Sequence, residues 1–311
     1  MHLRSFLLLP LLGLASVGGL APAQEAPRAS LWIDAVGGEP VAFEDMVEDL
    51  AGARVIYLGE THTVPRHHQA QREILEALAK TGKPVVLGLE QIEAYQQDTL
   101  DRFNRRELDG EGLAKALEWE KRWRNYKDYL PALKIAQDRG IAVIALNARA
   151  ETIRKIGRGS LAALTPEERA TLPAEIELND APYEALMNLQ LAVHMAFDPA
   201  KLRPVFEAQV ARDETMAERV ANALAQPNAP IVVVLCGSGH ARYGHGIPDR
   251  VRRRVPGAKD RIVILAQSGE LRMSDADRKQ MRETRVTHEQ LRRFGRPGDY
   301  LLVTEPPKAA K

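Results

Sequence analysis

The stretch Arg54-Val-Ile-Tyr-Leu-Gly-Glu-Thr-His62 is a short apolar run that ends on a carboxylate and an imidazole. Three later runs have the same form: Pro84–Leu89 before Glu90, Ile141–Leu146 before Asn147, and Ile231–Gly237 before Ser238-Gly-His240. Continuous apolar runs bounded by turn residues are typical of strands that are buried on both faces, which favours a parallel sheet. We therefore predict an α/β fold: a parallel-sheet core with crossover helices and a large helical insertion or lid.

The polar residues at the ends of these runs predict a functional site. In a parallel sheet the carboxyl ends of the strands lie along one edge, where ligands of open α/β folds bind. Side chains that are far apart in the sequence are then expected to meet at this edge. The residues concerned are Glu60, His62, Glu90, Asn147 and His240.

The N-terminal segment, residues 1–23, has the pattern of an export signal. Arg4 gives it a positive start, residues 6–20 are apolar, and Ala21-Pro-Ala23 is an A-x-A cleavage site. We expect a mature chain that begins at Gln24 and is exported to the bacterial periplasm. No Cys follows the apolar segment, and no later run is long and apolar enough to span a bilayer, so we expect a soluble protein without a lipid anchor.

Residues 24–305 are expected to form a single domain, followed by a disordered tail at 306–311. Helical additions are predicted at about 94–139 and 151–224. A helix is predicted from Pro65 to about Lys80, because proline suits a first helical position. A further helix is expected to begin at Glu90, and Tyr300–Val303 is expected to add an edge strand. The lone Cys236 excludes an intrachain disulfide.

The charge of the chain argues against a nucleic-acid partner, because the net charge is only +1. A local basic cluster does exist, and two interpretations of it stay open: a solvated helix face, or a site for acidic groups such as propionates. Its members are Arg250, Arg252, Arg253, Arg254, Lys259 and Arg261.

Glu60-x-His62 and Gly237-Ser-Gly-His240 carry the chemistry that the sequence suggests. In an extended chain, positions two apart face the same way, so Glu60 and His62 project together. Such a pair binds a metal, or acts as a base and the group that orients it; the alternative is an ion pair that caps the next helix. The second motif is neither a dinucleotide fingerprint nor a nucleophile elbow, since the glycines that these require are absent.

Several aromatic and histidine side chains are candidates for contact with a flat ligand. The cluster Trp119, Trp123, Tyr126 and Tyr129 would stack on such a ligand or form part of the core. His194 and either tyrosine, Tyr126 or Tyr129, have the chemistry to ligate haem iron. His67 and His68 are adjacent on a helix and point about 100° apart, so one of them is expected to face the site.

The chain resembles the ChaN-like haem-binding proteins of the haem-uptake/Tiki superfamily. The stretches that carry the resemblance are Leu58–His62 with Pro65 and His67-His68, Leu89-Glu90 with Gln96-Gln97, Tyr126–Ala136, Asn147, Phe206–Gln209, Arg212-Asp213 with Met216-Ala217, and Gly237–His240 with Gly246–Pro248. The resemblance implies a parallel α/β core and haem or iron acquisition at the bacterial envelope. The chain departs from many relatives in having Thr63-Val64 after the first histidine, and in lacking a lipid-bearing Cys.

The wider superfamily includes Tiki-type metal-dependent proteases and erythromycin-esterase-like hydrolases. Carried over to this chain, the resemblance points to Glu60, His62, Glu90 and His240 as catalytic residues, with Arg212 as a partner for an anion. As a hydrolase, the chain would use Glu60, His62 and His240 to hold a divalent metal, or His62 as general base with Glu90 orienting it.

Two functional hypotheses follow, with a purely structural envelope protein as a third. The first is an exported haem-binding protein for haem and iron acquisition; the second is the metal-dependent hydrolase. Partners would be haem and other envelope haem-uptake components, and pairing of two copies around haem is compatible with the sequence. The expected haem contacts are Tyr126, Tyr129, His194, Arg212, Asn147 and His68.

Overall fold

The computed structural model describes residues 30–123, 125–194, 202–228, 230–267 and 288–304, with only the backbone at 191–194, 267 and 288–289. The predicted export signal at 1–23 and the predicted tail at 306–311 lie outside the described residues. Within the described part, no helix is long and apolar enough to cross a membrane.

The core is an eight-stranded sheet with the order β2-β1-β8-β7-β3-β6-β4-β5. The six strands from β8 to β5 run parallel, and β1 joins β8 and β2 in antiparallel pairs. The strands are β1 (Ser30–Asp34), β2 (Glu39–Pro40), β3 (Val55–Glu60), β4 (Val85–Glu93), β5 (Ala142–Asn147), β6 (Ile231–Gly237), β7 (Asp260–Gln267) and β8 (Tyr300–Thr304).

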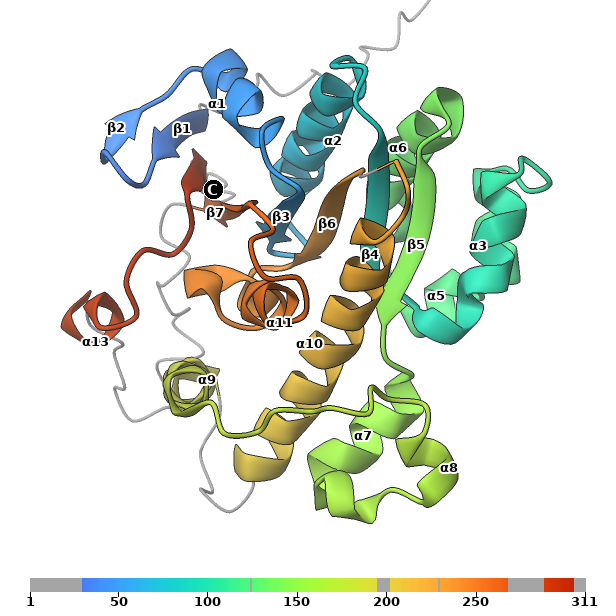
Figure 1. The fold of residues 1–311 in the computed structure, drawn as a ribbon, viewed down its shortest axis with the longest axis vertical. Helices are drawn as coiled ribbons and strands as arrows, with labels where there is room; N and C mark the ends of the chain where they lie inside the picture. Colours follow the sequence, from blue (N-terminus) through green and yellow to red (C-terminus); the bar gives the residue numbers. More distant parts are fainter. Residues whose placement is uncertain (1–29, 124, 195–201, 229, 268–287, 305–311) are drawn as a thin grey trace, which may run out of the picture.

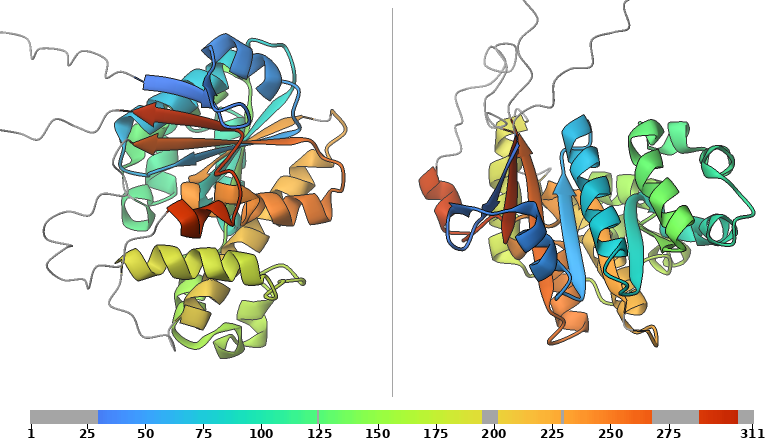
Figure 2. Two further views of the ribbon diagram at one scale, coloured as in Figure 1. Left: turned by 90° about the vertical axis from the view of Figure 1, so that its left-hand side faces the viewer. Right: turned by 90° about the horizontal axis from the view of Figure 1, so that it is seen from above.

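Helices cover both faces of this sheet (Figure 1, Figure 2). The α-helices are α1 (Phe43–Leu50), α2 (Pro65–Ala79), α3 (Gln97–Asn104), α4 (Gly110–Ala116), α5 (Trp119–Arg122), α6 (Tyr126–Arg139), α7 (Ala150–Gly159), α8 (Pro166–Arg169), α9 (Ala181–His194), α10 (Leu202–Leu224), α11 (Ile247–Arg254) and α13 (His288–Arg292). Short 3-10 helices are η1 (Ala94–Gln96), η2 (Leu161–Ala163), η4 (Ser238–His240) and η5 (Arg242–Gly244).

The central strands are buried on both faces, as the apolar runs predicted. On β3, Ile56 and Leu58 enter one hydrophobic cluster together with residues of α1, α2 and α6. Val55 and Tyr57 enter a second cluster with residues of α10 and α11. Alternate side chains of a strand point to opposite faces, so one apolar run supplies both layers. The prediction of an α/β fold with a parallel core is confirmed.

The predicted helix at Pro65 is confirmed, since α2 begins there with proline in its first turn. The helix predicted at Glu90 is wrong, because β4 continues to Glu93. The register of β4 against β5 shifts between Leu89 and Glu93, so the strand lengthens through an irregularity. Glu93 and Gln96 then form a capping box, which starts the helical segment.

Strand β8, predicted at the edge, lies between β1 and β7. The edge of the parallel sheet is β5, whose outward backbone groups bond to side chains of α3. Asn104 accepts from the Val143 N–H at 2.9 Å and donates to the Val143 carbonyl at 3.0 Å. Gln97 accepts from the Ala145 N–H at 2.9 Å. The two amides replace a neighbouring strand, so this edge is closed to strand addition.

We predict that Asn104→Ala lowers the free energy of unfolding by about 1–3 kcal/mol, because the buried Val143 N–H loses its acceptor and the Val143 carbonyl keeps only the 3.4 Å bond from Gln97. Denaturant unfolding measures this loss. Asn228→Ala is the matched control, since Asn228 is exposed and lies outside the sheet. A loss no larger than that of the control would contradict the role given to Asn104.

Candidate functional site

Strand order brings the predicted site residues together at the carboxyl edge of the sheet. Strand β6 lies between β3 and β4. It ends at Gly237, level with Glu60 at the end of β3. Glu90 on β4 accepts a hydrogen bond of 2.6 Å from the Gly237 N–H. Carboxylates of two non-adjacent strands therefore flank the end of the strand between them.

The Glu60 carboxylate is buried and surrounded by donors. Its Oε1 accepts from the Tyr129 hydroxyl at 2.6 Å and from Gln91 at 3.3 Å, and it lies 2.8 Å from His62 Nδ1. Its Oε2 lies 3.1 Å from His68 Nδ1. Burial on its own would raise the pKa of Glu60, but hydrogen bonds from His62, His68 and Tyr129 lower it to about 2. Glu60 is therefore an anion at neutral pH.

His62 is the exposed member of this cluster. Its side chain is 36% exposed, whereas the side chains of Glu60 and His68 are almost fully buried. Burial lowers the pKa of His62, but the Glu60 and Glu90 carboxylates outweigh it and raise the pKa above its usual value. The ring meets Trp123 edge-on, with 5.1 Å between centroids. Among the described residues, no hydrogen-bond partner is found for its Nε2.

The His62 imidazole occupies space that a side chain at position 237 would otherwise fill, and Gly237 leaves this space open. A methyl group at Gly237 would lie 2.8 Å from His62 Nε2 and 3.6 Å from Glu90 Oε2. Contacts of 2.8 Å are too short for a carbon atom, so any larger residue would displace the imidazole. The His62 carbonyl also accepts from Asn125 at 2.8 Å. Local backbone contacts and a missing side chain thus fix one imidazole at the strand ends.

His240 lies between two carboxylates on the other side of Gly237. Its Nδ1 donates to Asp213 at 2.5 Å, and its Nε2 lies 3.3 Å from Glu90 Oε1. Burial would lower the pKa of His240, but Glu90 and Asp213 raise it to about 10. Glu90 has the reverse balance: burial raises its pKa, and His240 lowers it to about 2. His240 is therefore a buried imidazolium at neutral pH.

Sequence reasoning missed the role of the residues that hold His240. Asp213 also accepts from the buried Tyr183 hydroxyl at 2.7 Å, and the Gln209 amide lies 2.9 Å from His240 Nδ1. Gln209 and Asp213 are four apart on α10, so they share a helix face. Both occur in the stretches that resemble the family, which is the signal that could have found them; Tyr183, on α9, gave none.

The predicted tyrosines have different positions. Tyr129 holds Glu60, and burial followed by the Glu60 charge raises its pKa well above the usual range. The Tyr126 hydroxyl donates to the Gly110 carbonyl instead, and burial raises its pKa to about 12. Both residues are buried. A phenolate ligand from either one would require breaking these bonds first.

The remaining predicted contacts are more scattered. His68 faces the site, whereas the ring of its neighbour His67 accepts from the Thr61 N–H at 2.9 Å. Asn147 is buried at the end of β5, and its Oδ1 has no partner among the described groups. Arg212 is half-buried on α10. His194 ends α9, and its side chain lies outside the described residues.

The predicted metal ligands Glu60, His62 and His240 are not grouped as a metal site. In the part of the chain that the structure describes, no set of three or more His, Cys, Asp or Glu side chains is arranged to hold a metal ion. His240 explains this, because carboxylates lie against both of its ring nitrogens. Glu90 contacts His240 rather than His62, so the predicted Glu90–His62 pairing is replaced by Glu60–His62.

The basic cluster is divided: Arg252, Arg253 and Lys259 are exposed, as a solvated helix face requires, whereas Arg250 is buried and paired inside the protein. Arg250 is fully buried, lies 3.2 Å from Glu214, and has its guanidinium over the Tyr183 ring at 5.2 Å. The other ion pairs of this cluster join Arg252 to Asp260, Arg253 and Arg254 to Glu214, and Arg261 to Asp49.

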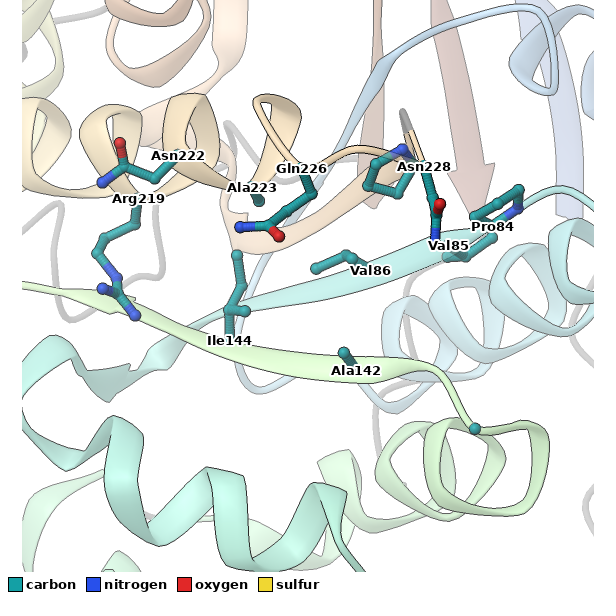
Figure 3. Close-up of a pocket in the computed structure, with 12 residues that line it drawn as sticks. Pro84, Val85, Val86, Ala142, Ile144, Arg219, Asn222, Ala223, Gln226 and Asn228 are labelled. Atoms are coloured by element: carbon teal, nitrogen blue, oxygen red, sulfur yellow. The ribbon is translucent and has the colours of Figure 1, made fainter.

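A separate hollow of about 440 Å³ lies at the opposite end of the sheet. Its lining includes the first residues of β4 and β5, and Gln226 projects toward Val86 and Ile144 (Figure 3). It contains none of the predicted site residues. The chemistry at the carboxyl edge is therefore independent of this hollow.

The family and the fold can be compared with known proteins at this point. No curated protein is significantly similar to the chain in sequence. A structure of ChaN from Campylobacter jejuni, described as cofacial haem binding, shares 22% identity and a TM-score of 0.66, and covers 89% of this chain and 97% of that one. The erythromycin esterase EreC shares 12% identity and a TM-score of 0.46, covering 90% and 84%. At 22% identity the likeness to the ChaN structure shows the fold alone.

The family model described as "Haem-binding uptake, Tiki superfamily, ChaN" matches residues 46–251, which include every strand end of the site. The match spans more than half of the chain. The chain therefore belongs to the ChaN family of haem-binding uptake proteins in the Tiki superfamily.

Proposed function

We propose that this protein binds haem at the carboxyl edge of its sheet, with His62 Nε2 as the iron ligand. One observation carries the proposal: His62 is exposed, its Nδ1 is held by a buried carboxylate, and no partner for its Nε2 is found among the described residues. Ligating histidines usually donate their other ring N–H to such a group, which fixes the tautomer and raises the basicity of the ligand. Histidine is a common axial ligand of haem iron.

The residues around Glu60 support this role by holding it rigidly. Tyr129 and Gln91 donate to its Oε1, and His68 lies against its Oε2. His62 therefore has an anion of fixed position behind it. Trp123, half-buried beside the His62 ring, supplies an aromatic wall for a flat ligand. These groups fit an imidazole-ligated porphyrin that enters from the solvent side.

We predict that purified protein shifts the Soret band of hemin with saturation, and that His62→Ala abolishes most of this shift because the iron ligand is lost. Added imidazole should partly restore the spectrum of His62→Ala. Glu60→Gln should weaken binding roughly 10–100-fold, the usual effect of losing a group behind a ligand. His245→Gln is the control for loss of an imidazole away from the strand ends.

The pH dependence has a defined sign. Only neutral imidazole binds iron, and the His62 pKa is raised above its ordinary value. Affinity should therefore fall as pH decreases through this raised pKa. A His62→Ala protein that keeps the wild-type spectrum, or that shows a phenolate-to-iron charge-transfer band, would contradict ligation by His62.

A hydrolase is the second candidate, favoured by the juxtaposition of His62 with a buried imidazolium. Glu60 orients His62 as a general base would require, and His240 carries a positive charge near the same glycine. As a hydrolase, the protein should cleave p-nitrophenyl acetate, and His62→Gln should stop the cleavage. Equal rates for the two proteins would exclude it, and metal analysis of fresh protein would show whether a divalent ion takes part.

We also propose export to the periplasm and a role in haem and iron acquisition. Support comes from the signal-like residues 1–23 and from the uptake description of the family. If the signal is cleaved as proposed, the protein recovered from a periplasmic extract should begin at Gln24, which N-terminal sequencing would establish. Recovery of an uncleaved chain from the cytoplasm would contradict this proposal.

A further inference from the structure

We propose that Arg149, stacked on Tyr95, binds the propionate carboxylates of the haem; the inference rests on the proposed function. Tyr95 lies in η1, directly after β4, and is 47% exposed. The guanidinium carbon of Arg149 lies 4.2 Å from the centre of its ring, and that of Arg122 lies 5.6 Å away. An exposed tyrosine between two guanidinium groups is an unusual surface, since it combines a flat apolar face with positive charge.

The two arginines differ in their partners. Arg122 Nη1 bonds to Glu93 at 3.0 Å and to Glu151 at 3.2 Å, so internal carboxylates neutralise its charge. Arg149 is exposed, and among the described residues it makes no ion pair or hydrogen bond. Its guanidinium is oriented by the Tyr95 ring, yet its donors remain free. A guanidinium held in this way is preorganised for bidentate binding of a carboxylate.

Arg149 follows β5, three strands from the strand that precedes His62, and its guanidinium lies over Tyr95, which follows the nearer strand β4. Strand β4 precedes Tyr95 and lies two strands away from β3 in the sheet. At the usual strand spacing, the distance between β3 and β4 is about 10 Å. A porphyrin spans a comparable distance between its iron and its propionate carboxylates. Trp123 bridges the gap, because it contacts His62 and directly follows Arg122 in the chain. In Figure 1, α7 lies below the lower end of β5 and α5 lies beside that end.

The surface therefore matches haem in two respects. An imidazole and an indole stand where the iron and the macrocycle would lie, and a free guanidinium stands where the anionic edge would lie. Arg149 would orient the haem rather than hold its iron. It would also favour haem over porphyrins whose propionates are uncharged.

The test compares hemin with hemin dimethyl ester, in which both propionates are esterified. Wild-type protein should bind hemin more tightly than the ester. Arg149→Gln should weaken hemin binding roughly tenfold or more, the effect of losing one charge-assisted bond, and should leave binding of the ester unchanged. Arg158→Gln is the matched control, since it removes the same charge from an exposed position on α7, the helix that Arg149 precedes as N-cap.

Three results would overturn the inference: equal affinity of wild-type protein for hemin and its ester, equal losses for both ligands in Arg149→Gln, or a loss in Arg158→Gln as large as in Arg149→Gln. Absence of any hemin binding by wild-type protein is a different outcome. It would overturn the proposed function itself, and this inference with it. Matching circular-dichroism spectra and unfolding midpoints of the variants exclude loss of fold as the cause.

Discussion

The buried charge of Glu60 is the constraint on which the site depends. A carboxylate at the end of a strand that is covered on both faces stays ionised only if donors replace the lost water. Here the donors come from four segments: the chain after β3, helix α2, strand β4 and helix α6. Satisfying one anion thus fixes how two helices and strand β4, which lies beyond β6, meet the end of β3. The same contacts set the position of the one exposed imidazole.

The second carboxylate, Glu90, pairs with the buried His240, whereas Glu60 pairs with the partly exposed His62. Folding lowers the pKa values of Glu60 and Glu90 to about 2 and raises that of His240 to about 10. The carboxylate contributions to stability are complete above their ordinary pKa and are lost as pH falls toward 2. The His240 contribution is complete below the ordinary imidazole pKa and is lost as pH rises through about 10. At neutral pH these three groups therefore keep their charges. Burial lowers the pKa values of His62 and His68, but the Glu60 carboxylate outweighs it and raises both.

Strand ends could be predicted from sequence because the apolar runs have a strong local pattern, and this pattern placed Glu60, His62, Glu90 and His240 correctly at one edge. The helix at Glu90 was wrong because a strand irregularity and a capping box moved its start. The side chains that contact these residues from other helices could not be predicted from the sequence. Asp213 and Tyr183 reach His240 from helices α10 and α9, and the Arg250 charge is met by Glu214 rather than by solvent. No local pattern specifies such pairings, since they depend on how distant helices pack.

The distribution of unpaired charge separates binding from catalysis in this fold. Three arginines of the described residues have internal carboxylates: Glu93 for Arg122, Glu214 for Arg250 and Asp49 for Arg261. Arg149 is stacked on an exposed ring without such a partner, on the same edge where His62 is exposed. A hydrolytic site needs its free groups to converge on one reacting atom. Here His62 follows β3 and Arg149 follows β5, three strand spacings away, roughly 14 Å. That separation suits a large planar ligand whose metal binds an imidazole and whose edge carries carboxylates. It suits a small reacting bond less well.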